Sequence, residues 1–81
     1  MKTITYEEFI NLSVKQQNHF NGITIDSCQT KVYRQNGIWH RIDGPAITWS
    51  DGSAEYWIND IQVTKKAQEL YYMLMKLKGL I

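Results

Sequence analysis

The sequence predicts an α+β protein in which a short antiparallel sheet lies between helical segments at the two ends of the chain. Three observations support this fold class. Helix-capping patterns occur in residues 1–22, turn dipeptides recur at short intervals through residues 23–63, and apolar residues at helical spacing follow in residues 64–81. The 81 residues have room for one hydrophobic core, so we expect a single domain.

The N-terminal segment carries two patterns that start helices. Thr5 and Glu8 have the spacing of a capping box, and Ser13 and Gln16 repeat it. We therefore expect two short helices, or one helix kinked near Ser13. The segment is predicted to end at Gly22, in the manner of a left-handed C-terminal cap.

The middle of the chain contains Asn-Gly, Asp-Gly and Asn-Asp dipeptides between short apolar runs. Such dipeptides tolerate the positive φ angles of tight hairpin turns, so we expect an antiparallel meander of about four to six short strands. The candidate strands are Ile23–Asp26, Lys31–Gln35, Ile38–Ile42, Ala46–Trp49, Ala54–Ile58 and Ile61–Val63.

A C-terminal helix is predicted after Thr64, which is suited to be its N-cap. Its apolar residues follow the spacing of one helix face, which we expect to pack on the sheet. Met73 and Met75 widen the apolar surface, which indicates burial or, alternatively, a second face for a partner. The residues of the expected face are Ala67, Leu70, Tyr71, Leu74 and Leu77.

Composition limits the classes of partner and the compartment. The formal net charge of +1 argues against a large electrostatic footprint for duplex nucleic acid. A lone Cys28 forms no internal disulfide, so we expect a core thiol and a reducing, cytoplasmic location. No apolar run has the length of a signal peptide or a membrane span, so we expect no membrane association. The small core leaves a homodimer possible.

One region resembles a known repeat. Residues 36–46 read N-G-I-W-H-R-I-D-G-P-A, and residues 51–60 read D-G-S-A-E-Y-W-I-N-D. This pattern is loosely similar to MORN repeats, of a type common in small bacteriophage and large-virus proteins; it departs from the type at Asp60, where glycine is usual. The resemblance implies a β-meander scaffold, a bacteriophage origin and a role as an interaction surface, without bringing an activity.

The repeat contains the only polar cluster that could carry chemistry, formed by His40, Arg41 and Asp43. Neighbouring residues on opposite strand faces do not converge on one substrate atom. We therefore favour a structural interpretation, in which Asp43 caps the Asp-Gly-Pro turn and the other two pack on adjacent strands. His19, His40 and Cys28 lack a recognised metal-ligand spacing, so we expect no metal, no cofactor and no enzymatic activity.

Aromatic residues are the second notable feature, with three Trp and five Tyr. Packing within a small sheet is expected to use most of them. Some aromatic surface is expected to stay exposed beside arginine, a composition typical of protein-interaction hot spots and of base-stacking platforms. The candidate partner-binding residues are Tyr33, Arg34, Trp39, Arg41, Trp49, Trp57, Met73 and Met75.

These observations favour non-catalytic binding to a protein. With the resemblance, the expected partner is a host or defence protein that a phage accessory protein inhibits or redirects in the host cytoplasm. The alternative is a small RNA-, single-stranded DNA- or nucleotide-binding protein, with Trp39, Trp57 or Tyr33 stacked on bases. Lys31, Arg34 and Arg41 would then contact phosphates. Self-association in an assembly is a third possibility.

Overall fold

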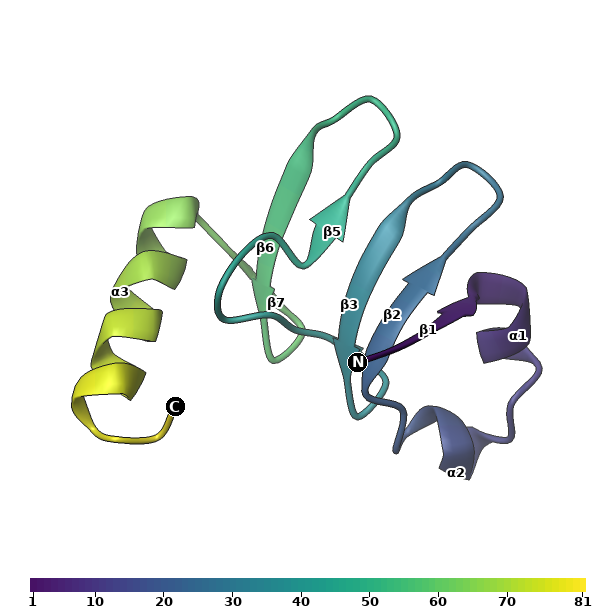
Figure 1. The fold of residues 1–81 in the computed structure, drawn as a ribbon, viewed down its shortest axis with the longest axis horizontal. Helices are drawn as coiled ribbons and strands as arrows, with labels where there is room; N and C mark the ends of the chain where they lie inside the picture. Colours follow the sequence, from purple (N-terminus) through teal and green to yellow (C-terminus); the bar gives the residue numbers. More distant parts are fainter.

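The computed structural model describes all 81 residues and has the predicted α+β fold (Figure 1). Seven strands form the sheet, and three helices accompany it. In chain order the elements are β1 (Lys2–Thr5), α1 (Tyr6–Ile10), α2 (Val14–Gln17), β2 (Gly22–Ile25), β3 (Lys31–Gln35), β4 (Ile38–Trp39), β5 (Ile47–Thr48), β6 (Ala54–Ile58), β7 (Ile61–Val63) and α3 (Lys65–Leu77).

The sheet is mixed, where we expected a purely antiparallel one. Its strand order is β1-β2-β3-β5-β6-β7, and β4 pairs with β3 beside this path. All pairs are antiparallel except β1 with β2, which are parallel with Lys2 opposite Gly22. We expected residues 1–22 to be helical, and β1 is therefore an element that the sequence patterns do not predict.

Gly22 begins β2 and does not cap a helix, contrary to expectation. A Cβ atom at this position would lie 2.2 Å from the carbonyl oxygen of Lys2, so the close approach of β1 requires glycine. The helix that we expected to end here, α2, already ends at Gln17 with Asn18 as its C-cap.

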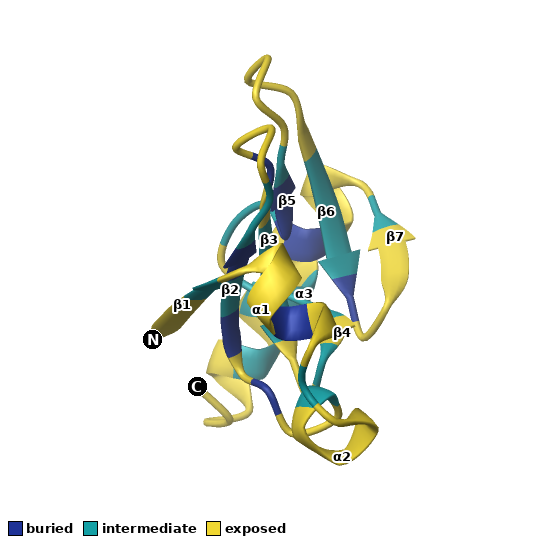
Figure 2. Cartoon of the chain, turned by 90° about the vertical axis from the view of Figure 1, so that its right-hand side faces the viewer, coloured by how far each residue is buried: buried dark blue, intermediate teal, exposed yellow.

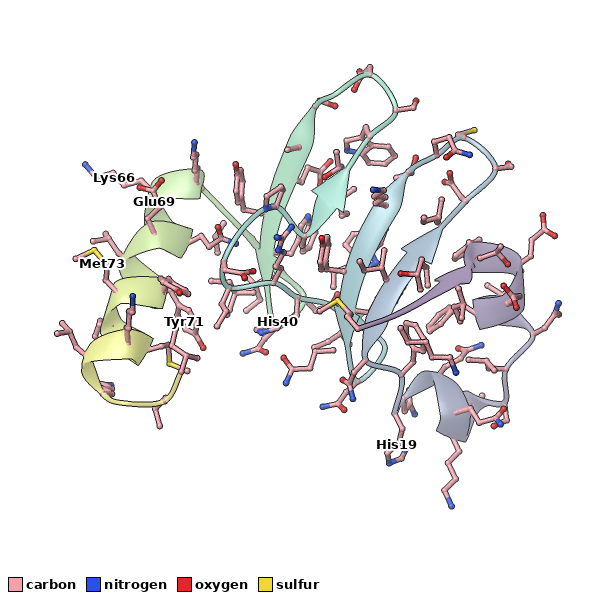
Figure 3. The ribbon with its side chains drawn as sticks, in the orientation of Figure 1. His19, His40, Lys66, Glu69, Tyr71 and Met73 are labelled. Carbon is pink, nitrogen blue, oxygen red and sulfur yellow. The ribbon has the colours of Figure 1, made fainter.

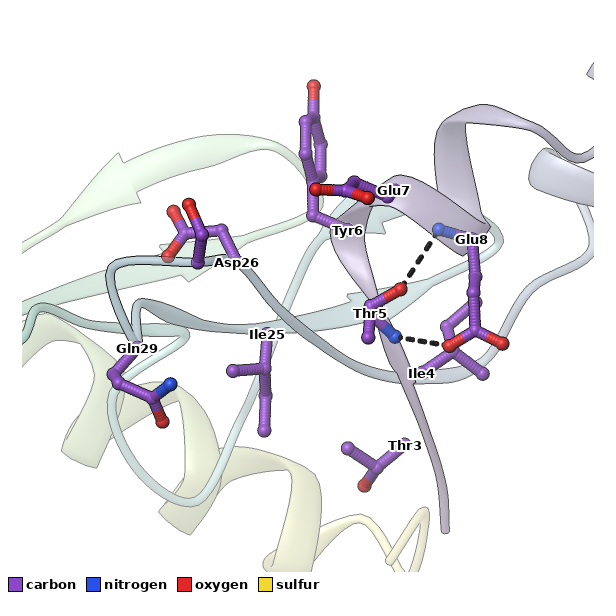
Figure 4. A pocket seen from close by; sticks show the side chains of 10 residues that line it. Thr3, Ile4, Thr5, Tyr6, Glu7, Glu8, Ile25, Asp26 and Gln29 are labelled. Atoms are coloured by element: carbon purple, nitrogen blue, oxygen red, sulfur yellow. Dashed lines mark hydrogen bonds between the residues drawn. The ribbon is translucent and has the colours of Figure 1, made fainter.

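Both predicted capping boxes are present. The hydroxyl of Thr5 accepts from the backbone N–H of Glu8, and the Glu8 carboxylate accepts from the backbone N–H of Thr5, both at 3.0 Å (Figure 4). The hydrogen bonds with Thr5 lower the pKa of the Glu8 carboxyl group, and the bond from the Thr5 backbone N–H has the largest effect. Ser13 and Gln16 form the same reciprocal pair at the start of α2. The N-terminal helical segment is therefore two short helices.

One long edge of β3 is shared by two strands. β4 pairs with its C-terminal end, where Trp39 lies opposite Arg34, and β5 pairs with its N-terminal end, where Ile47 lies opposite Val32. Both strands are two residues long and shorter than predicted, because the chain leaves the sheet between them. We call this segment, residues 41–45, the excursion loop.

The core lies where α1 and the residues before β2 meet the centre of the sheet (Figure 2). The rings of Phe9 and Phe20 meet edge to face with centroids 5.6 Å apart. Such aromatic pairs add to the stabilisation from burial alone. The buried apolar residues of the core are Phe9, Phe20, Ala46, Ile47 and Ile58.

Two of the predicted tight turns have the positive φ angles that their dipeptides indicate. Asn36 and Gly37 both have positive φ angles between β3 and β4, as a type I′ hairpin requires. Asn59 and Asp60 have φ angles of 50° and 69°, so Asp60 adopts the conformation in which the repeat pattern has glycine.

Cys28 is exposed in the β2–β3 turn and is not a core thiol, because the turn projects from the sheet.

The helix α3 begins after the N-cap Thr64, as predicted, but packs differently from the expected arrangement. Its one buried residue is Gln68, which is 4% exposed. The Gln68 side-chain amide donates to the carbonyl oxygens of Arg41, at 2.8 Å, and Gly44. The helix thus docks on the excursion loop at the side of the sheet, and the expected apolar face, with Leu70 and Leu74, remains exposed.

Candidate functional site

The registers of the sheet place one row of side chains beside α1. Val32 lies opposite Thr24 on one side and Ile47 on the other, and Ile47 lies opposite Glu55. Side chains of directly paired residues project from the same face of a sheet. Arg34, two residues beyond Val32, joins this face, so it combines an apolar floor with a few polar groups.

An open groove of about 430 Å³ runs over this face, between the sheet and α1. We call it the aromatic groove. Its volume is in the range of sites that bind small ligands or single side chains, and such sites are mostly apolar with few polar groups. The apolar residues that line it are Tyr6, Phe9, Ile10, Val32, Trp39, Ile47 and Trp49.

Glu55 organises the tryptophans at the end of the groove. The indole N–H of Trp49 donates to Glu55 Oε2 and that of Trp57 donates to Glu55 Oε1, both at 3.0 Å. The Trp57 ring also meets the ring of Trp39 edge to face, with centroids 4.7 Å apart. One carboxylate and one ring contact therefore fix the three indoles, which we call the tryptophan cluster.

Arg34 supports the other end of the groove. Its Nε donates to the hydroxyl of Thr24 at 3.1 Å, and its Nη1 donates to the carbonyl oxygen of Gly37 at 3.0 Å. The guanidinium carbon lies 4.3 Å from the centroid of the Phe9 ring. Burial lowers the pKa of Arg34 from its ordinary value, although the side chain stays charged at neutral pH. This guanidinium is occupied in holding α1 on the sheet.

The opposite face of the sheet carries Tyr33 and Arg41. The Arg41 guanidinium stacks 3.9 Å from the centroid of the Tyr33 ring. Its Nε donates to Asp43 Oδ1 at 2.9 Å and its Nη1 to the carbonyl oxygen of Pro45 at 3.2 Å. Asp43 therefore accepts from Arg41, where we expected it to cap the turn backbone. Through these contacts Arg41 joins the start of the excursion loop to its middle and its end.

His40, the third member of the predicted polar cluster, has a different partner. Its Nδ1 accepts from the backbone N–H of Asn59 at 2.9 Å, so this nitrogen carries no proton. Burial lowers the pKa of the imidazole. The hydrogen bond ties the residue before the excursion loop to the β6–β7 turn. The contacts of all three residues thus give the His-Arg-x-Asp pattern a structural role.

The eight predicted binding residues fall into three places. Four contribute to the groove face, two lie on the opposite face, and two lie on α3, where Met73 is exposed and Met75 is half-buried. Tyr6 and Ile10 also line the groove and were not predicted, because their capping-box context indicates a helix but not its position. The groove-face residues are Arg34, Trp39, Trp49 and Trp57, and the pair on the opposite face is Tyr33 and Arg41.

At the tryptophan cluster, free cations are not combined with aromatic rings in the way that stacked nucleic acid needs. Alternation along β3 places Lys31 on the face opposite to Arg34. Arg34 and Arg41 are both engaged in contacts within the chain. Arg34 lies opposite Trp39 but donates to groups of the chain, and the Glu55 carboxylate beside the other two tryptophans repels phosphate.

A second hollow, of about 500 Å³, lies between β1, α1 and the β2–β3 turn (Figure 4). Two of its acidic residues have structural partners: Glu8 caps α1, and Asp26 Oδ1 accepts from the backbone N–H groups of Cys28 and Thr30, both at 2.9 Å. No group of three or more His, Cys, Asp or Glu side chains is arranged to hold a metal ion. None of the helices combines the length and the apolar character needed to cross a membrane.

Comparisons of the chain with protein-family models, with curated proteins and with solved structures give no significant match.

Proposed function

We propose that this protein acts by non-catalytic binding to another protein, and that the aromatic groove accepts an apolar or aromatic side chain of that partner. The observation that carries the proposal is an open apolar groove lined by Trp39 and Trp49, which belong to a cluster of three indoles fixed by one carboxylate and one ring contact. A site whose side chains are already ordered loses little conformational entropy when a partner binds.

The composition of the groove supports a protein partner. Interaction hot spots are rich in Trp, Tyr and Arg, and they lie in pockets from which water is expelled. Trp49 and Tyr6 are both partly exposed at the groove and keep apolar surface available. Glu55 has four lone-pair sites, of which the two indoles use a part, so it can also accept a hydrogen bond from a partner's backbone N–H.

The alternative, binding of RNA, single-stranded DNA or a nucleotide, has less support. It requires free cations beside the stacking rings, whereas Arg34 and Arg41 are engaged within the chain and the Glu55 carboxylate accepts from two of the indoles. The bacteriophage origin and the inhibition of a host or defence protein, which the repeat resemblance implies, stay predictions. The proposal of a groove for a protein side chain does not depend on them.

Peptide selection tests the proposal without knowledge of the natural partner. Random peptides are selected against the immobilised protein and titrated into isotopically labelled protein, with the three indole N–H signals followed by NMR. We expect selected peptides to contain an aromatic or aliphatic anchor and to shift the signals of Trp39 and Trp49 most, because these two tryptophans line the groove.

A matched pair of variants locates the binding. Ile10→Asp places a charge at the rim of the groove, and Ile61→Asp makes the same change on β7; the two isoleucines are 50% and 66% exposed. We expect Ile10→Asp to weaken peptide binding about tenfold or more and Ile61→Asp to leave it unchanged. Equal affinity of the two variants would contradict the proposal. Salt-sensitive quenching of tryptophan fluorescence by a single-stranded oligonucleotide would favour the alternative.

A further inference from the structure

The helix α3 has two faces of different character. One face packs toward the excursion loop: Gln68 is buried, and Tyr71, Tyr72 and Met75 are half-buried. The opposite face has the spacing i, i+3, i+4 and i+7, and its side chains are between 50% and 85% exposed. We call this face the outer stripe. It consists of Leu70, Met73, Leu74 and Leu77.

No other part of the chain covers the outer stripe. Figure 1 shows α3 at the opposite end of the molecule from α1, and Figure 3 shows Met73 on the side of α3 that faces away from the sheet, whereas Tyr71 lies on the sheet side. Four neighbouring large apolar residues at this exposure form a contiguous patch, and such patches mark interaction sites.

The pattern of the stripe fits the same stripe in a second copy. Leu70, Met73 and Leu77 repeat at the a and d positions of a heptad. If two copies of α3 pack antiparallel about a two-fold axis between Met73 and Leu74, Leu70 of one copy faces Leu77 of the other. Each copy then buries its stripe against an identical surface, as an isologous interface requires.

The charges beside the stripe select the antiparallel direction. Glu69 and Lys76 lie on the same side of the stripe, one helical repeat of seven apart. The two-fold axis brings this side of one copy next to the same side of the other copy. Glu69 of one copy therefore approaches Lys76 of the other, and the contact occurs twice. Neither Glu69 nor Lys76 forms an ion pair within the protein, whose ion pair joins Arg41 to Asp43. Lys76 Nζ lies 5.7 Å from the centroid of the Tyr72 ring on its own helix. Antiparallel packing also opposes the helix dipoles favourably.

We propose that the protein forms a symmetric dimer through the outer stripes of α3, packed antiparallel and flanked by two Glu69–Lys76 ion pairs. The dimer interface lies on different elements from the aromatic groove, so the proposal does not rest on the proposed function. The occupant of the stripe is a second copy of the same chain.

Light scattering and sedimentation of the pure protein, from micromolar to millimolar concentration, test the proposal. We expect a mass that rises with concentration from 9.5 kDa toward twice that value. Leu77→Asp is expected to weaken dimerisation about 100-fold or more, because the symmetric interface loses two buried leucines and gains two charges. Ile61→Asp, an equally drastic change at an exposed isoleucine on β7, is the matched control and should leave the dimer intact.

Charge reversal tests the direction of packing. Glu69→Lys alone and Lys76→Glu alone each create two repulsive contacts, and we expect each to weaken the dimer about tenfold. The double variant Glu69→Lys with Lys76→Glu restores both pairs and should restore dimerisation. Circular dichroism of each variant verifies that α3 is folded.

Three outcomes would overturn the proposal. The first is a monomer at every concentration, including one that sediments with anionic vesicles and so uses the stripe on a membrane. The second is a dimer that survives Leu77→Asp. The third is a double charge variant that dimerises no better than the single variants, which would refute the antiparallel arrangement.

Discussion

The docking of α3 depends on one polar side chain, and Gln68→Met tests this dependence. Methionine has a similar length and helix propensity, but its thioether cannot donate to the carbonyl oxygens of Arg41 and Gly44. The variant therefore removes two hydrogen bonds and leaves the packing volume nearly unchanged. Gln62→Met on β7 makes the same chemical change at an exposed residue without such contacts and is the matched control.

The expected loss is about 2 kcal/mol, because each hydrogen bond contributes about 1 kcal/mol net. This loss falls on α3 alone, since the buried apolar residues of the sheet do not include any residue of the helix. An isolated helix of 13 residues is only marginally stable in water, so an undocked α3 also frays. The opening equilibrium of the helix should rise about 30-fold, given a tenfold change for each 1.4 kcal/mol.

Amide hydrogen exchange measures this opening residue by residue. We expect faster exchange along α3 in Gln68→Met, with the amides of β2 and β3 unchanged, and a urea transition by helical circular dichroism that precedes the transition by tryptophan fluorescence. A uniform increase of exchange across the whole chain, or a change as small as that of Gln62→Met, would refute the view that Gln68 holds the helix.

Two further predictions concern the β3–β4 turn and the pH dependence of stability. Gly37→Ala should destabilise the protein by about 2 kcal/mol or more in urea unfolding, because φ is +80° and the new Cβ would lie 2.3 Å from the carbonyl oxygen of Gln17; an effect below about 0.5 kcal/mol would contradict the described turn. The pKa of His40 is lowered by burial, so the unfolded chain binds the proton more tightly and stability should fall as pH decreases through 6.5 toward the folded pKa. In His40→Gln, the urea midpoint should lose this part of its pH dependence between about pH 8 and about pH 5. A midpoint that changes with pH as it does in the unsubstituted protein would exclude His40 as the source.

The elements with local causes were predictable from the sequence. Capping pairs such as Thr5 with Glu8 act within one turn of helix, and Asn36-Gly37 sets its own φ angles, so these sites need no distant contact. Strand β1 was missed because its partner β2 follows only after two helices, and parallel pairing leaves no turn dipeptide between the strands. Local patterns do not encode such pairing.

The packing direction of α3 could not be predicted for a related reason. The helical spacing of Leu70, Leu74 and Leu77 predicted an apolar face against the sheet, but these three leucines remain exposed. The structure instead uses Gln68, whose partners are backbone carbonyl groups in a loop. Carbonyl groups are common to all residues, so nothing in the sequence marks these two as acceptors. The aromatic groove was partly predictable, because its tryptophans were identified but the position of α1 over them was not.

The aromatic groove and the outer stripe of α3 lie toward opposite ends of a molecule whose longest dimension is 38 Å (Figure 1). A pair of chains joined through α3 would therefore present two grooves that point outward and are separated by the width of both sheets. Against a target with two copies of the recognised side chain, the second contact becomes intramolecular, and the avidity can exceed the affinity of one groove by about 100-fold or more. A weak groove would then suffice for tight capture of a repetitive or dimeric target, whereas a monomeric target would be released quickly.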